Sequence, residues 1–267
     1  MTTQPDWNAI AEKFDIWLPV LAPVGKSMLD ALKARPGDRI LDVGSGTGEP
    51  ALSLARQMGD TVEIIGVDQA AGMAKVAQHK VSTEGLNNIH FQTMAAEALT
   101  FADAEFDKVI CRFGVMLFDD PFQGLKEMYR VLKPGGRLVF TVWSIPERMP
   151  TMFWAYEVFK DRVPEERHPP LHVVTRLGPP GVLEEMIQDA KFSEHQVIRE
   201  TFRYAFSSFD DYWDAVVSSD LLKAQYEDLP VEDRTCIRDE IALFAEAFVT
   251  DKGLVIPHEY LLAKAVK

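Results

Sequence analysis

The stretch Ile40-Leu41-Asp42-Val43-Gly44-Ser45-Gly46-Thr47-Gly48-Glu49-Pro50 decides the fold of this chain. Its apolar start, over residues 39–43, predicts a short buried strand. The three glycines that follow predict a tight turn with positive φ angles, which leaves the backbone open to a ligand. A helix expected over residues 51–58 begins directly behind this turn, so its unpaired N–H groups would face the same ligand.

Position 49 limits the kind of ligand that this turn can hold. The dinucleotide fingerprint GxGxxG requires a glycine there, whereas this chain has Glu49, whose carboxylate would repel a pyrophosphate. Asp68 ends the next predicted strand, where a carboxylate can accept hydrogen bonds from both hydroxyls of a ribose. A nucleoside without phosphate therefore fits better than a dinucleotide, and S-adenosylmethionine (SAM) is such a molecule.

Apolar strand segments alternate with helical segments along most of the chain. Strands are expected over residues 39–43, 63–68, 89–94, 106–111, 137–143, 195–206 and 255–266, and helices over 51–58, 70–84, 121–132 and 181–190, with two more starting near 208 and 230. Strands that alternate with helices are typical of a parallel sheet covered on both faces.

Three segments fall outside this alternation. Residues 1–35 are predicted to be helical, with Pro23 and Gly25 interrupting the pattern. Residues 144–180 contain seven prolines and a bulky cluster, which is either core or pocket wall: Met149, Met152, Phe153, Trp154, Tyr156 and Phe159. We expect one domain over residues 1–267, in which 144–180 and 207–250 form a helical lid over a substrate pocket.

Three motifs in this order resemble the class I SAM-dependent methyltransferases. They are Asp42-Val43-Gly44-Ser45-Gly46-Thr47-Gly48 after the first strand, Val67-Asp68 at the end of the second, and Leu132-Lys133-Pro134-Gly135-Gly136 before the fifth. The segment from Cys111 to Pro121 is similar to the ubiquinone/menaquinone-type and natural-product branch. The resemblance implies an α/β, Rossmann-like, doubly wound fold: a mostly parallel seven-stranded sheet with an antiparallel last strand.

The resemblance also implies a set of cofactor-binding residues: Asp42, Gly44, Ser45, Gly46, Asp68, Gln69, Met73, Ala96, Glu97 and Arg112. The glycine loop would pass beneath the methionyl part of SAM, oriented by Asp42, and Arg112 would lie near its carboxylate or amine. Asp68 would hold the ribose, and Gln69 and Met73 would flank the adenine.

The adenine end departs from the family pattern. An Asp-Ala-Glu triplet often follows the third strand in that family, but this chain has Ala95-Ala96-Glu97. The side-chain contact to the exocyclic amine is therefore missing, while the backbone N–H of Ala96 can still serve the ring. This departure weakens the expectation of adenine selectivity without changing the cofactor class.

The expected reaction is methyl transfer from SAM to O, N or C of a small, apolar or aromatic metabolite. The sulfonium makes the methyl group electrophilic, so a base is needed only if the acceptor must lose a proton. His168, His172 and His258 are weak candidates for that base, and each is also explained as a structural residue. A non-catalytic SAM-binding protein and a nucleotide-dependent oxidoreductase remain the alternatives.

Charge and cysteine content limit the partners. The chain carries 28 Lys and Arg against 41 Asp and Glu, a net charge of −13, which disfavours nucleic acids and anionic membranes. Acidic groups at 210–214 and 227–240 would favour neutral or cationic substrates. Cys111 and Cys236 form no CxxC pair, so we expect neither a disulfide framework nor a metal site. Residues 1–6 lack a signal-peptide pattern, so a cytoplasmic protein, monomeric or homodimeric, is expected.

Overall fold

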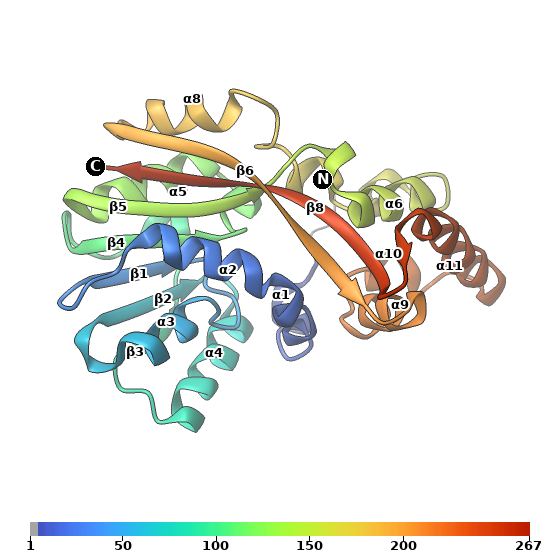
Figure 1. Cartoon of the computed structure of the whole chain (residues 1–267), viewed down its shortest axis with the longest axis horizontal. Coiled ribbons are helices and arrows are strands. Elements are labelled where there is room, and N and C mark those ends of the chain that lie inside the picture. Colours follow the sequence, from blue (N-terminus) through green and yellow to red (C-terminus); the bar gives the residue numbers. More distant parts are fainter. Residues whose placement is uncertain (1–4) are drawn as a thin grey trace.

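Eight strands form one mixed sheet in the computed structural model, which describes residues 5–267 (Figure 1). The strands are β1 (Arg39–Val43), β2 (Glu63–Asp68), β3 (Ile89–Thr93), β4 (Phe106–Arg112), β5 (Leu132–Trp143), β6 (Glu194–Phe206), β7 (Val249–Thr250) and β8 (Gly253–Val266). Their order is β3-β2-β1-β4-β5-β8-β6, and the two-residue β7 pairs with β8. The predicted seven-stranded sheet is thus confirmed, with β7 as a short addition.

The strand directions also agree with the prediction. β1 pairs in parallel with β2, where Leu41 lies opposite Ile65, and with β4 on its other side. β8 runs antiparallel between β5 and β6, with Phe140 opposite Ala263. The carboxyl ends of β1, β2 and β4 therefore meet at one edge of the sheet, where ligands bind in folds of this kind.

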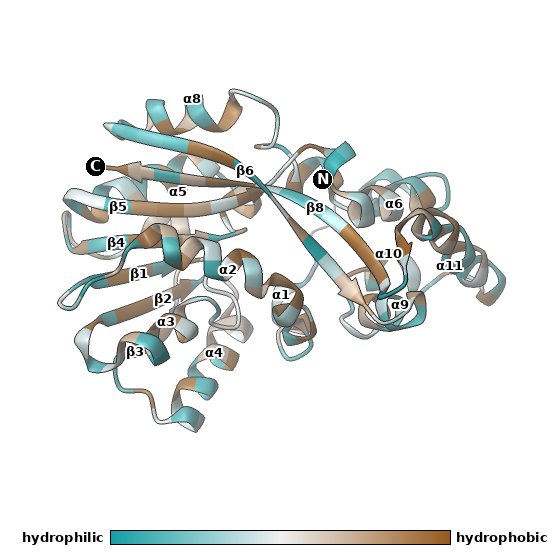
Figure 2. Cartoon of the chain, viewed as in Figure 1, coloured by the Kyte–Doolittle hydropathy of each residue, from teal (hydrophilic) through white to brown (hydrophobic). Residues whose placement is uncertain are grey.

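Eleven α-helices are present among the described residues. They are α1 (Trp7–Ile10), α2 (Leu18–Leu32), α3 (Ala51–Met58), α4 (Ala71–Glu84), α5 (Pro121–Val131), α6 (Pro150–Phe159), α7 (Leu171–Val174), α8 (Val182–Asp189), α9 (Phe209–Ser218), α10 (Lys223–Tyr226) and α11 (Val231–Ala245). In Figure 1, α2 lies in front of the sheet and α5 behind it. The central strands between them are the most apolar part of the molecule (Figure 2).

The predicted interruption at Pro23 is wrong. Pro23 and Gly25 both lie inside α2, which continues to Leu32. A proline inside a helix removes one backbone hydrogen bond, but the buried side chains of Val24 and Met28 pack this helix onto the sheet core. Tertiary packing therefore outweighs the local helix-breaking tendency.

β6 and β8 pair over thirteen residues and extend beyond the rest of the sheet (Figure 1). Their far ends carry α9, α10 and α11, against which α6 packs. A helix was expected to start near 208, and the N-cap half of a capping box is present there: the Ser208 hydroxyl accepts a hydrogen bond from the backbone N–H of Asp211 at 3.1 Å. This ribbon places the helices of 207–250 beside the ligand-binding edge of the sheet.

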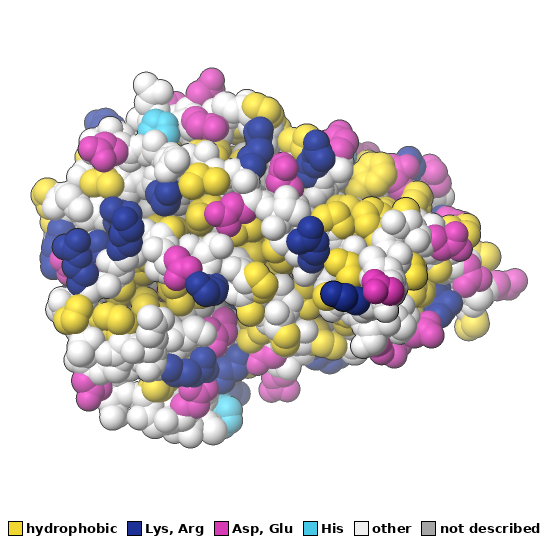
Figure 3. Space-filling view, in the orientation of Figure 1, with side chains coloured by type: hydrophobic (Ala, Val, Ile, Leu, Met, Phe, Trp, Pro, Cys, Tyr) yellow, Lys and Arg dark blue, Asp and Glu magenta, His cyan; other side chains and the backbone are white. Residues whose placement is uncertain are grey.

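Acidic side chains recur over this helical end of the molecule (Figure 3). Several of them are paired: Asp210 with Arg238, and Glu240 with Arg162. The longest helices, α2 and α11, have 15 residues each, and no helix within residues 5–267 has the length and apolarity to cross a bilayer. Residues 1–4, part of the segments used for the signal-peptide and N-terminal helix predictions, lie outside the described chain.

Candidate functional site

The glycine loop joins β1 to α3 with three left-handed residues. The φ angles of Gly44, Gly46 and Gly48 are +66°, +54° and +106°. A Cβ on Gly48 would lie 2.6 Å from Leu52 Cδ1, so this position also needs glycine for packing. A Cβ on Gly46 would meet nothing within 4 Å, because Gly46 borders an open cavity. The loop therefore presents bare backbone to that space.

Asp68 ties the end of β2 to this loop. Its Oδ2 accepts a hydrogen bond from the backbone N–H of Gly46 at 2.9 Å, and its Oδ1 accepts one from that of Ala70 at 2.8 Å. Burial raises the pKa of the Asp68 carboxyl, although both backbone hydrogen bonds act to lower it. Each carboxylate oxygen keeps a second lone pair, so Asp68 can still accept two hydrogen bonds from a ligand.

Asp42 is buried at the end of β1, and Arg112 is half-buried at the end of β4; the charge of Arg112 acts on Asp42, although no ion pair joins them. Asp42 is 1% exposed, and its Oδ2 has no hydrogen-bond partner among residues 5–267. Burial raises the pKa of Asp42 well above its ordinary value, and the positive charge of Arg112 opposes that rise. Burial also lowers the pKa of Arg112. Arg112 borders the cavity directly, whereas Asp42 does not.

One cavity of about 310 Å³ brings most of the predicted cofactor residues together. The predicted residues that line it are Gly44, Ser45, Gly46, Asp68, Gln69, Met73, Ala96 and Arg112. Glu97 does not line it, because its Oε1 turns away and accepts a hydrogen bond from the backbone N–H of Asp120 at 3.3 Å. The lining adds Glu49, whose carboxylate pairs with Arg56 at 2.7 Å and accepts from Ser53.

None of the three candidate histidines lines this cavity. The rings of His168 and His172 both pack edge-on against Tyr156. His258 is fully buried, with its Nε2 2.8 Å from Thr151 Oγ1, and burial lowers the pKa of His258 to about 4. Among the described residues that line the cavity, Thr151, Tyr204 and Trp143 contact His258 and separate it from the open space.

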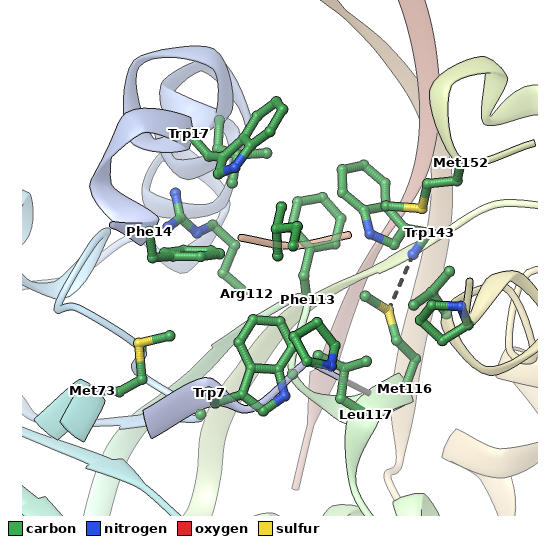
Figure 4. Close-up of a pocket in the computed structure, with 18 of the residues that line it drawn as sticks. Trp7, Phe14, Trp17, Met73, Arg112, Phe113, Met116, Leu117, Trp143 and Met152 are labelled. Atoms are coloured by element: carbon green, nitrogen blue, oxygen red, sulfur yellow. Dashed lines mark hydrogen bonds between the residues drawn. The ribbon is translucent and has the colours of Figure 1, made fainter. Parts of the chain in front are cut away.

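Aromatic, aliphatic and thioether side chains line the cavity around Arg112 (Figure 4). Besides Met73, the apolar residues labelled there are Trp7, Phe14, Trp17, Phe113, Met116, Leu117, Trp143 and Met152. Phe113 has a φ of +56° at the end of β4, and its ring stacks on Trp143 at 3.7 Å. This strained backbone turns an aromatic face toward the cavity, as is common at functional sites.

Only part of this lining was predictable. In the bulky cluster of 149–159, Met152 lines the cavity, but Met149 is core and Trp154 packs on Phe244 of α11. The N-terminal members Phe14 and Trp17 were expected only as one face of a helix. Their position over the site follows from α1, where Asn8 Oδ1 accepts a hydrogen bond from Gly72 N–H at the start of α4, at 2.8 Å.

Comparison with known proteins gives the family. A model of the ubiE/COQ5 methyltransferase family matches residues 21–165. A ubiquinone/menaquinone biosynthesis C-methyltransferase UbiE of Geotalea daltonii is 42% identical over 149 residues, 54% of this chain and 63% of the relative. A demethylmenaquinone methyltransferase of Bacteroides fragilis is 38% identical over 134 residues, 49% of this chain and 54% of the relative. The chain thus spans less than two thirds of the length of these relatives.

Solved structures share the fold at low sequence identity. The YcgJ protein of Bacillus subtilis has a TM-score of 0.65 and 22% identity, covering 92% of this chain and 98% of that protein. A phosphoethanolamine N-methyltransferase 2 of Haemonchus contortus, solved with S-adenosyl-L-methionine, has a TM-score of 0.60 and 18% identity. The match covers 94% of this chain and 56% of that protein. The sheet order, the glycine loop with Asp68, and the family match over 21–165 agree: this chain belongs to the ubiE/COQ5 methyltransferase family.

Proposed function

We propose that this protein transfers a methyl group from SAM to a ring carbon of a small aromatic hydroquinone. The observation that carries this proposal is one continuous cavity, lined on one side by the glycine loop with Asp68 and on the other by aromatic side chains. The relatives named above as C-methyltransferases of ubiquinone and menaquinone biosynthesis support the choice of acceptor.

The loop side of the cavity suits SAM. The backbone of Gly44 and Gly46 would pass beneath the methionyl part, and the free lone pairs of Asp68 would accept from the ribose hydroxyls. The guanidinium of Arg112, which makes no hydrogen bond or ion pair with residues 5–267, borders the cavity and would hold the methionine carboxylate. The buried hydroxyls of Ser45 and Thr47 also have no protein partner in that range, so this loop retains polar groups for a ligand.

The adenine would lie beyond Asp68. Gln69, Met73 and Ala96 line that part of the cavity, and Met94 adds a second thioether. The carboxylate of Glu97 points elsewhere, so recognition there would rest on the backbone of Ala96 and on packing. A preference for adenine over other bases should accordingly be modest.

The aromatic side would position the acceptor. When bound, SAM would supply an electrophilic methyl group and become S-adenosylhomocysteine, and the ring carbon that accepts the methyl group would give up its proton to a water molecule. The stacked rings of Phe113 and Trp143 would hold an aromatic acceptor in line, which lowers the entropic part of the barrier. No histidine borders the cavity, so none is assigned as the base.

We also propose that residues 144–180 and 207–250 act as a lid. Both segments contribute lining side chains, Met152 and Leu171 from the first, Tyr212 and Ile241 from the second. Closing them over the bound pair would shield the methyl group of SAM from bulk solvent. The acidic side chains of this region are largely on the outer surface, where Asp210 and Glu240 pair with arginines.

Two measurements test the proposal. Calorimetry should detect binding of SAM and S-adenosylhomocysteine, and none of NAD. Incubation with methyl-labelled SAM and 1,4-dihydroxynaphthalene should give a product whose new methyl group NMR places on a ring carbon. Heat with NAD and none with SAM would exclude a methyltransferase. Label on oxygen instead of carbon would exclude the C-methylation proposed here.

A further inference from the structure

Two tyrosines from the C-terminal part of the chain line the cavity. Tyr204 belongs to β6 and Tyr212 to α9, and they are 6% and 3% exposed. Phe206 lies between them, with its ring centroid 6.5 Å from that of Tyr204 and 5.4 Å from that of Tyr212. The ribbon of β6 and β8 and the helix that follows it thus bring both side chains to one wall.

Neither tyrosine hydroxyl has a hydrogen-bond partner among residues 5–267. The indole N–H of Trp17, whose ring lies 6.0 Å from that of Tyr204, is also buried there without a partner. By contrast, the hydroxyl of Tyr260 on neighbouring β8 donates to Glu200. Buried polar groups are nearly always hydrogen-bonded, so the buried indole N–H of Trp17, beside two cavity-lining tyrosine hydroxyls that no described protein group engages, indicates a ligand at this wall.

The contacts that these tyrosines make with neighbouring side chains do not explain why the chain has tyrosine rather than phenylalanine at these positions. Tyr204 stacks on His258 with ring centroids 4.1 Å apart and planes inclined by 21°, a contact of ring faces. Both nitrogens of His258 have other partners, Thr151 Oγ1 and the carbonyl of Ile256. Phenylalanine would make the same ring contacts, so packing alone does not require a hydroxyl at position 204.

The charged and polar groups around this wall indicate which kind of ligand atom it can bind. Tyrosine hydroxyls and an indole N–H can all donate, and the positive charge of nearby Arg112 acts on Tyr204. The two carboxylates that border the cavity belong to the proposed cofactor side: Glu49 pairs with Arg56, and Asp68 is assigned to the ribose. The wall therefore suits an oxygen that accepts hydrogen bonds rather than an ammonium group.

We propose that Tyr204, Tyr212 and Trp17 form a hydrogen-bonding site for an oxygen of the methyl acceptor. The inference rests on the proposed function and narrows it: the acceptor is an aromatic ring that carries a hydroxyl or carbonyl oxygen, held with that oxygen toward β6 and α9. These three residues are positioning residues for the acceptor and take no part in binding SAM.

The test uses 1-naphthol and 1-methylnaphthalene, which differ only by hydroxyl against methyl. Binding to the full chain is followed by quenching of tryptophan fluorescence, with and without S-adenosylhomocysteine. The wild type should bind 1-naphthol about tenfold more tightly than 1-methylnaphthalene. The double variant Tyr204→Phe, Tyr212→Phe should reduce that ratio to about twofold or less. Tyr129→Phe, on α5 and outside the cavity, should keep the wild-type ratio.

Two further readouts make the outcome decisive. Thermal unfolding of the double variant should match or exceed that of the wild type, because the lost hydroxyls have no protein partner. A preserved naphthol preference in the double variant, or its absence in the wild type, would overturn the inference. Failure to bind S-adenosylhomocysteine would instead overturn the proposed function, while the ratio measured without it still tests the tyrosine wall.

Discussion

Asp68→Ala is the substitution that most directly tests how the loop holds a nucleoside. In the structure, the Asp68 carboxylate accepts hydrogen bonds from the backbone N–H groups of Gly46 and Ala70 and keeps two lone pairs for a ligand. The substitution therefore removes both a tie within the loop and the proposed ribose contacts. These two effects have different sizes and can be measured separately.

The effect on folding should be small for a residue this buried. Two hydrogen bonds to a charged acceptor contribute about 1.5–3 kcal/mol each. Their loss is offset because burial raises the pKa of Asp68, which means that the ionised carboxylate is costly to keep in the fold. We expect the free energy of unfolding to change by less than about 2 kcal/mol, or less than about 8 °C in Tm.

The effect on cofactor binding should be large. Two lost hydrogen bonds from ribose hydroxyls to a carboxylate amount to about 3 kcal/mol or more, so the Kd for S-adenosylhomocysteine should rise by roughly 100-fold or more. Calorimetry measures that Kd, and circular dichroism measures Tm on the same samples.

Asp120→Ala provides the matched control. Asp120 also accepts a backbone hydrogen bond, from Gln123 N–H at 2.9 Å, but it caps α5 outside the cavity. Its loss should lower stability by about 1 kcal/mol and leave the Kd unchanged. A Kd for Asp68→Ala within twofold of the wild type would refute the ribose assignment. An equal loss of affinity in Asp120→Ala would show that general destabilisation, and not the ribose contact, is responsible.

Three other substitutions test buried groups. Burial raises the pKa of Asp42, so Asp42→Asn should be more stable than the wild type at pH 7, and urea titrations should show that advantage shrinking as pH falls below the folded-state pKa toward the lower pKa of the unfolded chain. Burial lowers the pKa of His258 to about 4. As pH falls from 6.5 to 4, the free energy of unfolding of the wild type should therefore drop by about 3 kcal/mol relative to that of His258→Gln. Parallel plots of unfolding free energy against pH for the two proteins would contradict this. Gly66→Ala places a Cβ 2.2 Å from Phe91 Cδ1 and should lower Tm by several degrees. Adding Phe91→Leu to this variant should restore part of the lost Tm. An unchanged Tm in Gly66→Ala would show that the Phe91 ring moves freely.

The parts of the fold that were predictable are those with local causes. β1 and α3 occur at the predicted residues because an apolar strand, a glycine turn and a helix start are each encoded by adjacent residues. Gly85 ends α4 in the left-handed conformation for the same reason. Pro23 was misjudged because its effect depends on how α2 packs on the sheet, which is not a local property.

The candidate site also has a part that was predictable from the sequence and a part that was not. The cofactor residues are predictable because strand order alone brings the ends of β1, β2 and β4 together. Sequence alternation places Phe202, Tyr204 and Phe206 on one side of β6, but it does not show which face meets a cavity. That depends on the twist of the ribbon formed with β8 and on the helices that follow it. Tyr212, which follows the capping box at Ser208, had no signal beyond a position on a helix.

The two sides of the cavity therefore carry different information about function. The glycine loop, Asp68 and Arg112 all lie within residues 21–165, where the family model matches. Trp17, Tyr204 and Tyr212 all lie outside that range, on segments for which family membership makes no statement. The family match thus covers the proposed donor site together with Phe113 and Trp143, whereas the proposed oxygen site is built by β6, α9 and the N-terminal helices. A variant that loses S-adenosylhomocysteine binding therefore leaves the proposed oxygen site untested, and variants of Tyr204 and Tyr212 are needed to test it.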